Sequence, residues 1–362
     1  MLIKAFIEVL LPIVVVVGIG YLLKRFLPID TRSLNRISMY ALSPALIFIT
    51  IVKIQIPGTE VLRISLTSVA ACLGSGLVAY LIARWLKLSG STGAGLLLVT
   101  MFMNSGNYGL PTAQFAFGQA GFERALLFFI AQAIMAQTLT IAIAQAGKSD
   151  WKAGVRQVLR MPPIYAVATG LLLRAWGVQF DTPNALGSVL HGIDLVSQAT
   201  LPLLLMLLGM QLAQETVIED YRLTSIAVVI RLLVSPLIAY GAARWLQLDP
   251  LATKVVVLQA SMPTAVNMVL YSLEFDARPK FVAGVVVVTT VLSVLTLTGL
   301  LTFMGVGVGW HVRAPMSQWR LPVRHRPIRF GRLVGATLGD ARPPQSCHCR
   351  SAGSHATAGL RW

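Results

Sequence analysis

Ten long apolar runs dominate this chain and restrict what it can fold into. An α-helix needs about 20 apolar residues to cross the hydrocarbon core of a bilayer, and these runs lack the alternation of half-buried strands. Only 12% of the 362 residues are charged, whereas a soluble domain has about 25%. We therefore expect an all-α integral membrane protein. Its ten predicted spans are Ala5–Leu23, Ile37–Val52, Ile64–Ala83, Gly93–Phe117, Ala125–Gln145, Pro162–Val178, Ile193–Ala213, Leu223–Ala243, Thr253–Leu273 and Phe281–Met304.

Features of the first half of the chain return in the second half at a nearly constant spacing. The matching pairs are Gly20–Lys24 with Gly170–Arg174, Pro44 with Pro202, Arg84–Leu88 with Arg244–Leu248, and Pro111 with Pro263. Five spans per copy is an odd number, so the second copy must enter the membrane in the opposite orientation. The sequence therefore predicts two inverted five-helix repeats, residues 1–146 and 161–309, with a linker at 147–160 and a tail at 310–362.

The fourth and ninth spans are interrupted at corresponding places. Asn104–Pro111 breaks the first of them, and Ser261–Pro263 breaks the second, with Asn267 one turn further on. Glycine and proline weaken or break a helix, and each freed N–H or C=O group in hydrocarbon needs another partner. Broken segments at matching positions of two halves are typical of the substrate site of a transporter.

The residues at the two breaks suit an anion. A half-helix that resumes near Pro111 points its positive end toward the break, where a carboxylate can bind. Side-chain amides add donors and acceptors on both sides. The candidate substrate-binding residues are Asn104, Asn107, Tyr108, Gly109, Pro111, Pro263, Asn267 and Arg231. The alternative interpretation is a pair of proline kinks whose asparagines bond neighbouring helices.

Arg231 lies about 12 Å from the start of its span at 1.5 Å per residue. A cation at such a depth costs about 2.5–3.5 kcal/mol on insertion scales, so it is usually paired or faces a cavity. Two interpretations stay open: Arg231 attracts an anionic substrate, or it has a structural role, in which it bonds loose carbonyl groups near Pro236 or snorkels to the membrane surface. Four glutamines are expected to bond between helices, with lining of the substrate path as the alternative: Gln132, Gln137, Gln198 and Gln211.

Asn104–Pro111 resembles the N-x-G-N-x-G-L-P signature of the auxin efflux carrier family. Pro263–Asn267 resembles the second crossover of that family, and Leu201–Leu204 followed by Leu208–Met210 resembles its seventh span. The resemblance covers the chain from Met1 to about Gly309. It implies that helices four and nine cross at the substrate site, with a scaffold and a transport domain as in bile-acid/sodium symporters.

The resemblance also implies a class of substrate. Bacterial members resemble carriers of small organic anions such as malate or malonate, whereas plant relatives export auxin. The long central loop of the plant members has no counterpart here, so regulation through that loop is not expected.

Lysine and arginine residues in short loops predict the orientation. With the N-terminus outside, thirteen of them fall in inside loops and seven in outside loops, and the Lys148–Arg160 loop is cytoplasmic. The tail from His311 has nine arginines and one acid, Asp340, and its composition predicts disorder. We expect no nucleic-acid partner for it. Cys347-His348-Cys349 lacks the further ligands of a zinc site, so no metal is predicted.

Together these features predict a multi-pass protein of the cell inner membrane. Its expected activity is secondary transport of a small organic anion, a carboxylate, by alternating access, with export as the expected direction. A channel or a substrate sensor on the same fold is the alternative. An intramembrane enzyme is disfavoured, because His191 is the only histidine before the tail. We expect no cofactor; the partners are the anion and the lipid bilayer, and a homodimer is left open. Neither break contains an acid, so no coupling ion is assigned.

Overall fold

A computed structural model describes residues 2–144, 162–176, 185–213 and 218–306. The predicted linker at 147–160 and the tail at 310–362 lie outside the described residues. Within the described ranges every regular element is a helix, apart from one isolated β-bridge between Met103 and Thr264. The expectation of an all-α membrane protein therefore holds for the part of the chain that is described.

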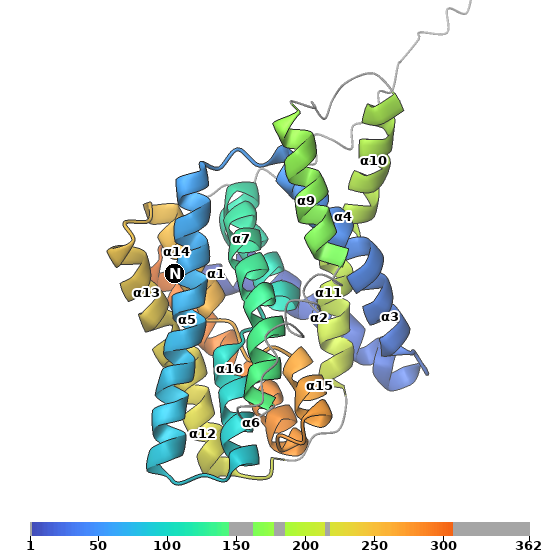
Figure 1. Ribbon diagram of the computed structural model, residues 1–362. Coiled ribbons are helices and arrows are strands. Elements are labelled where there is room, and N and C mark those ends of the chain that lie inside the picture. Colours follow the sequence, from blue (N-terminus) through green and yellow to red (C-terminus); the bar gives the residue numbers. More distant parts are fainter. Residues whose placement is uncertain (1, 145–161, 177–184, 214–217, 307–362) are drawn as a thin grey trace, which may run out of the picture. The chain divides into compact units, whose positions relative to one another are not determined.

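The elements follow one another along the chain as α-helices, which Figure 1 labels, joined by short loops and by four π-helical turns, which are called η in the text. They are α1 (Leu2–Ala5), η1 (Phe6–Leu10), α2 (Leu11–Phe26), α3 (Thr31–Ile37), η2 (Ser38–Leu42), α4 (Ser43–Lys53), α5 (Gly58–Trp85), α6 (Gly90–Met101), η3 (Ser105–Gly109), α7 (Leu110–Ala144), α9 (Pro162–Ala175), α10 (Ala185–Gln198), α11 (Thr200–Leu212), α12 (Tyr221–Val229), η4 (Ile230–Val234), α13 (Ser235–Trp245), α14 (Pro250–Ala260), α15 (Asn267–Glu274) and α16 (Pro279–Phe303).

Six continuous helical stretches of the described chain are long and apolar enough to cross a membrane. They are Leu2–Phe26, Thr31–Lys53, Gly58–Trp85, Ala185–Leu212, Tyr221–Trp245 and Pro279–Phe303, and they coincide with the first, second, third, seventh, eighth and tenth predicted spans. The predicted fourth and ninth spans are each divided between shorter helices. The fifth forms the later part of α7, which bends at Gly118, where φ is 65°.

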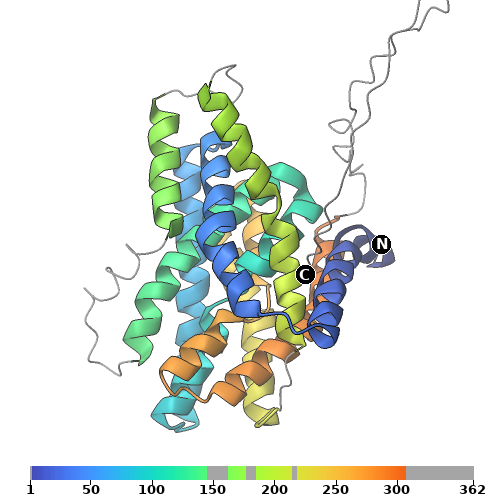
Figure 2. The ribbon, with the colours of Figure 1, turned by 90° about the vertical axis from the view of Figure 1, so that its right-hand side faces the viewer.

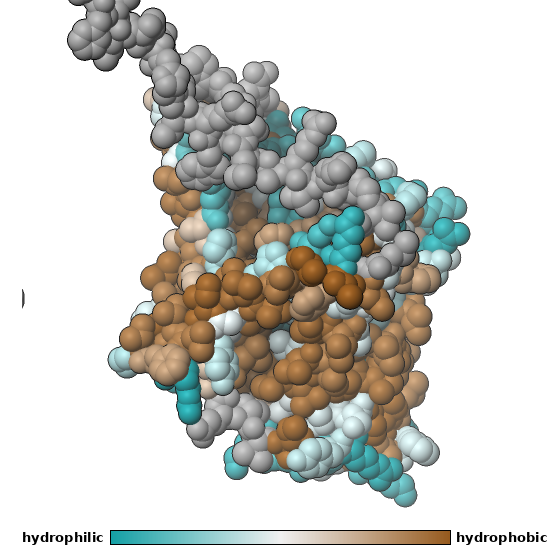
Figure 3. Space-filling model, turned by 180° about the vertical axis from the view of Figure 1, so that it is seen from behind, coloured by the Kyte–Doolittle hydropathy of each residue, from teal (hydrophilic) through white to brown (hydrophobic). Residues whose placement is uncertain are grey.

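The surface of the helices suits a lipid environment. Large apolar side chains cover much of the face in Figure 3, and hydrophilic side chains gather near its upper and lower parts. Phe303 and Leu295 on α16 are 91% and 72% exposed. Trp85 and Trp245, which end α5 and α13, are also exposed, as is typical of aromatic residues at a membrane interface.

One group of helices forms around two close contacts. α2 packs against α11, and α4 packs against α9 and α10; both Figure 1 and Figure 2 place the green α9 and α10 beside α4. The α2–α11 contact brings the two backbones together at Gly20 and Gly209. A Cβ atom at Gly20 would overlap the carbonyl oxygen of Met206, and one at Gly209 would overlap that of Val17. Small residues therefore set the spacing of these helices.

The remaining helices gather around α5. This helix packs against α6, α7 and α13, while α14 packs against α13 and α7. α12 and α15 pack against α16, which also contacts α6. The two short helices that precede the breaks, α6 and α14, both contact α5 and α7.

Each of the four π-helical turns ends two residues before a proline. These prolines are Pro12, Pro44, Pro111 and Pro236. Proline lacks the N–H group that would bond the carbonyl four residues back, so that carbonyl is freed. In three cases the residue before the proline donates instead to a carbonyl five residues back: Leu11 to Phe6, Ser43 to Ser38, and Ser235 to Ile230. The prolines therefore account for the wider turns.

Candidate functional site

The two interrupted segments meet at their backbones. The N–H group of Asn104 donates to the carbonyl oxygen of Pro263 at 2.7 Å, and the N–H group of Ala265 donates to that of Phe102 at 2.9 Å. These bonds flank the antiparallel bridge between Met103 and Thr264. Each break thus satisfies part of the backbone that the other leaves unpaired, which is what a non-helical stretch needs inside hydrocarbon.

Buried side chains from two neighbouring helices hold the breaks in place. Gln132 on α7 donates from Nε2 to the carbonyl oxygen of Met103 at 2.6 Å and accepts from the Ser105 hydroxyl at 2.9 Å. The Thr264 hydroxyl donates to the carbonyl oxygen of Val99 at 2.7 Å, and the N–H group of Thr264 donates to the Thr289 hydroxyl on α16 at 3.2 Å. The sequence predicted that Gln132 bonds between helices, and its bonds do join α7 to the first break. The side chain of Gln137 lies outside what the structure describes.

The two asparagines of the first break differ in their surroundings. Asn104 is 5% exposed, and its carbonyl oxygen accepts the N–H groups of Tyr108 and Gly109 at 3.3 and 3.0 Å. Its side-chain nitrogen Nδ2 is buried without a hydrogen-bond partner among the described residues. Asn107 is half-buried and lines a cavity of about 30 Å³.

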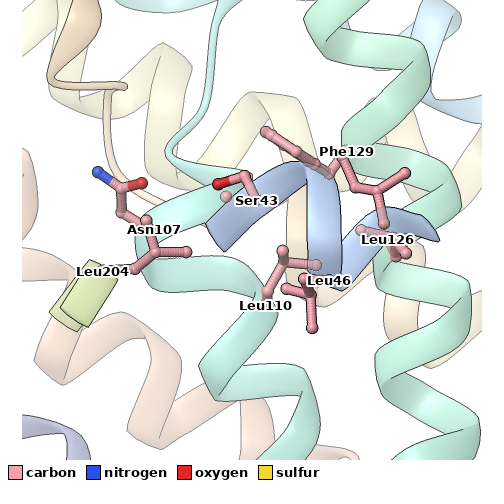
Figure 4. A pocket seen from close by; sticks show the side chains of 9 residues that line it. Ser43, Leu46, Asn107, Leu110, Leu126, Phe129 and Leu204 are labelled. Carbon is pink, nitrogen blue, oxygen red and sulfur yellow. The ribbon is translucent and has the colours of Figure 1, made fainter. Parts of the chain in front are cut away.

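The small cavity lies between η3, α4, α7 and α11. Asn107 and Ser43 supply its polar side chains, and the other labelled side chains are apolar (Figure 4). Its lining residues are Ser43, Leu46, Ile47, Gly106, Asn107, Leu110, Leu126, Phe129 and Leu204. A volume of this size is large enough for a water molecule but is well below the roughly 300–1,000 Å³ of a typical ligand pocket.

The other predicted site residues occupy both sides of the crossover. Tyr108 is buried, and its hydroxyl interacts with that of Ser293 on α16. Pro111 is buried in the first turn of α7, and Pro263 contributes the carbonyl oxygen already described. Asn267 is the first residue of α15 and is exposed. Asn267 is not among the residues that line the Asn107 cavity.

Sequence reasoning missed Gln259, the most unusual polar residue of the crossover. Gln259 lies in the last turn of α14 and is fully buried. Neither its amide oxygen nor its amide nitrogen has a hydrogen-bond partner among the described residues. Its Oε1 lies so close to Gly109 that a Cβ atom there would overlap it. A buried amide left unpaired costs about 1–3 kcal/mol, so a partner beyond the described residues would stabilise this group. The available signal was a glutamine in an apolar run two residues before the second break.

Arg231 lies in the π-helical turn η4. Its side chain is fully buried. Nη1 donates to the carbonyl oxygen of Thr100 at 2.6 Å, while Nη2 donates to that of Ala260 at 2.7 Å and to the Ser235 hydroxyl. Of the two interpretations left open by the sequence, this geometry matches bonding to loose carbonyl groups. The carbonyls are those of two other helices, however, and not those near Pro236.

A larger cleft of about 510 Å³ lies next to the small cavity, and Leu46 lines both. Polar side chains of this cleft include Thr50, Gln114 and Gln198, and Lys53 pairs with Asp194 at 3.2 Å within it. Its volume falls in the range of small-molecule sites. Gln198, which the sequence placed in the seventh span, therefore lines a space large enough for a small anion.

Six long apolar helices in the described ranges, together with the two interrupted ones, are typical of a polytopic membrane protein. The chain belongs to the family described as membrane transport proteins, whose sequence profile matches residues 5–301. This match bears out the resemblance to auxin efflux carriers. The protein is thus a multi-pass membrane protein of a transporter family.

Three relatives align over 80% of this chain. An uncharacterized transporter of Methanothermobacter thermautotrophicus is 28% identical over 294 residues, covering 95% of its own length. An uncharacterized transporter of Methanocaldococcus jannaschii is 26% identical over 298 residues and 96% of its length. A protein of Rhizobium meliloti named "putative malonate transporter" is 26% identical over 314 residues and 93% of its length. All three names describe transporters and not enzymes.

Proposed function

We propose that this protein is a secondary carrier that moves a small organic anion, a carboxylate, across the cytoplasmic membrane by alternating access. The observation that carries the proposal is the crossing of two broken helices beside buried amide atoms that have no hydrogen-bond partner among the described residues. These atoms are Nδ2 of Asn104 and both amide atoms of Gln259. Amides can bind a carboxylate without burying a further charge, and they release it again at low cost.

The electrostatics of the crossover favour a negative ligand. α7 resumes at Leu110 after the first break, and α15 begins at Asn267 after the second. The N-terminal end of a helix carries a partial positive charge of about half a unit. No Asp or Glu side chain is buried among the described residues, so no fixed anion competes for these ends. A mono- or dicarboxylate fits this setting, and the malonate named for the Rhizobium relative is a compound of that class.

The packing of the helices supports two inverted five-helix repeats. In such a repeat α2 of the first half corresponds to α9 of the second, and α4 corresponds to α11. The contact between α2 and α11 should therefore have a counterpart between α9 and α4, and both pairs do pack together. The chain also ends α5 and α13 in the same way. Leu88 donates to the carbonyl of Ala83, and Leu248 donates to that of Ala243, both at 3.0 Å. In each cap the residue before the leucine, Lys87 or Gln247, has a positive φ.

In this proposal the repeats are residues 1–146 and 161–309, and they combine into a scaffold and a transport domain. α2, α4, α9, α10 and α11 form the scaffold, while the helices around α5 carry the crossover. The cleft lined by Gln114 and Gln198 is then the route by which the anion reaches Asn107, because Leu46 borders both spaces. Export as the direction stays a prediction from the sequence, and a homodimer stays open.

The test uses purified protein in liposomes with radiolabelled malonate and related mono- and dicarboxylates. Liposomes preloaded with unlabelled anion should take up label faster than empty ones, because exchange returns a loaded carrier. Uptake should saturate as the anion concentration rises. Protein-free liposomes prepared in parallel give the background.

Two other outcomes would reject the carrier. Uptake that rises linearly with concentration, without acceleration by internal anion, would indicate a channel. Saturable binding without any uptake would indicate a sensor on the same fold.

A further inference from the structure

The fully buried guanidinium of Arg231 joins the ends of the two helices that lead into the crossover. Thr100 lies in the last turn of α6, and Ala260 is the last residue of α14. The last four carbonyl groups of a helix have no partner within it. Arg231 bonds one of them at each end, from a position 131 residues along the chain from Thr100 and 29 residues from Ala260.

The charges at this place balance. The C-terminal end of a helix carries a partial negative charge of about half a unit, so two such ends amount to about one negative charge. The guanidinium carries one positive charge and stays protonated. Arg231 forms no ion pair with an acidic side chain in the described part of the chain, and its acceptors there are the two carbonyl oxygens and the Ser235 hydroxyl. The negative charge that balances the guanidinium is therefore the partial charge of the two helix ends.

In transporters with broken helices, half-helix C-terminal ends and unwound carbonyls commonly coordinate the coupling cation. We propose that Arg231 is a resident cation: its guanidinium fills the cation position of the crossover and binds the ends of α6 and α14 in place of sodium or a proton. The inference rests on the proposed function only in treating the crossover as the transport site. The carrier then binds its anion at the half-helix N-termini without loading a cation at the C-termini.

Removal of the guanidinium should leave a site that an added cation can occupy. Arg231→Ala leaves the carbonyl oxygens of Thr100 and Ala260 and the Ser235 hydroxyl facing the space that the guanidinium filled. Methylguanidinium has the charge and the planar donors to refill that space. Sodium is the second probe, because it takes oxygen ligands.

The experiment monitors thermal unfolding of purified protein in detergent, with choline chloride keeping ionic strength constant. The variants are wild type, Arg231→Ala and the control Arg244→Ala, which removes an exposed arginine of the adjoining helix α13. We expect Arg231→Ala to unfold several degrees lower, and millimolar methylguanidinium or sodium to recover part of that loss. Wild type and Arg244→Ala should not respond to either cation. An equal response of all three proteins would overturn the proposal.

A second pair of variants covers the case in which Arg231→Ala does not fold. Arg231→Lys keeps the charge, and Arg231→Met keeps length without charge. The resident-cation role requires the Lys variant to have the higher unfolding temperature; equal temperatures, or the reverse order, would refute it.

Anion uptake into liposomes tests the proposal at the level of transport. Wild-type uptake should be unchanged when choline replaces sodium, and a sodium requirement in wild type would contradict the proposal even if transport itself is established. If no anion is transported at all, the carrier function fails, but the order of the Lys and Met variants still decides the role of Arg231.

Discussion

Two buried glutamines at the crossover have opposite bonding. Gln132 uses both ends of its amide, donating to Met103 and accepting from Ser105. Gln259 uses neither end within the described residues. A bonded amide stabilises the fold, whereas an unpaired one is a cost that a ligand can relieve.

This difference predicts opposite effects of the same substitution. Gln259→Met replaces an unpaired amide by an apolar side chain of similar length, so the unfolding temperature should stay the same or rise while anion affinity falls about tenfold or more. Gln132→Met should lower the unfolding temperature, because Met103 and Ser105 lose their partner. Thermal unfolding and titration calorimetry measure both. A loss of stability in Gln259→Met without a change in affinity would show that this amide has a structural partner.

The asparagines of the two halves give a second prediction at this scale. Each amide bond to a charged group contributes about 1.5–3 kcal/mol, so Asn107→Ala and Asn267→Ala should each weaken anion binding by about tenfold or more. If both side chains touch one ligand, the double variant should deviate from additivity.

Affinity is to be measured on variants of matched thermal stability. Unchanged affinity in both single variants would move the anion site away from these residues. Asn107 is half-buried and Asn267 is exposed, so the double variant decides whether one ligand reaches both side chains.

Single residues also mark the limit of sequence reasoning. The depth of Arg231 in its span indicated that it needs a partner, but the partners are carbonyl groups of helices far away in the sequence. Every residue has a backbone carbonyl group, so the residue types in the sequence do not indicate which carbonyl will accept a bond from Arg231. For the same reason the sequence could predict that the two breaks meet, but not that the N–H group of Asn104 donates to the carbonyl oxygen of Pro263.

At the scale of helices, glycine and proline determine local geometry in different ways. Pro236 frees a carbonyl and widens the turn that holds Arg231. Gly20 and Gly209 let two helix backbones approach each other. The first break was predictable because Gly106, Gly109 and Pro111 are clustered there, and the second because Pro263 interrupts an apolar run at the matching place. The π-helical turns were not predicted, since a proline in an apolar run equally fits an ordinary kink.

The α2–α11 contact allows a matched test. Gly20→Ala places a Cβ atom against the backbone of Met206, which cannot rotate away, and overpacking of this kind costs about 1–3 kcal/mol. Gly18→Ala on the same helix meets no atom within 4 Å. We expect a lower unfolding temperature for Gly20→Ala and little change for Gly18→Ala. Equal effects of the two substitutions would mean that helix propensity, and not the contact, determines the result.

At the scale of the whole molecule, length and hydropathy were sufficient to locate the long spans. Six of them correspond to long apolar helices of the structure. Helices interrupted at the crossover fall short of a full span on their own, as α6 and α14 do, so their identification depended on the pattern of glycine and proline. The predicted disorder of the tail and the predicted location of the Lys148–Arg160 loop lie outside the described residues.

The orientation is the prediction that belongs to this scale. A cysteine placed in the Lys148–Arg160 loop should be shielded from an impermeant thiol reagent in intact cells, because the excess of lysine and arginine places that loop in the cytoplasm. Gln55→Cys should react readily, because Gln55 is exposed in the loop between α4 and α5, which the same charge count places outside. Both variants are made in a background in which the native cysteines are replaced. The reverse labelling pattern would invert the topology.

The two backbone bonds between Phe102–Asn104 and Pro263–Ala265 also have a mechanical consequence. They link the broken helices directly, at the point where each helix is weakest, so neither break can shift without carrying the other. In the proposed carrier the amides of both sides would therefore travel together, and the cargo should keep the same ligands in every position of the cycle. Such a carrier would move its binding site past the barrier as one piece, and its affinity for the cargo should be similar from either side of the membrane.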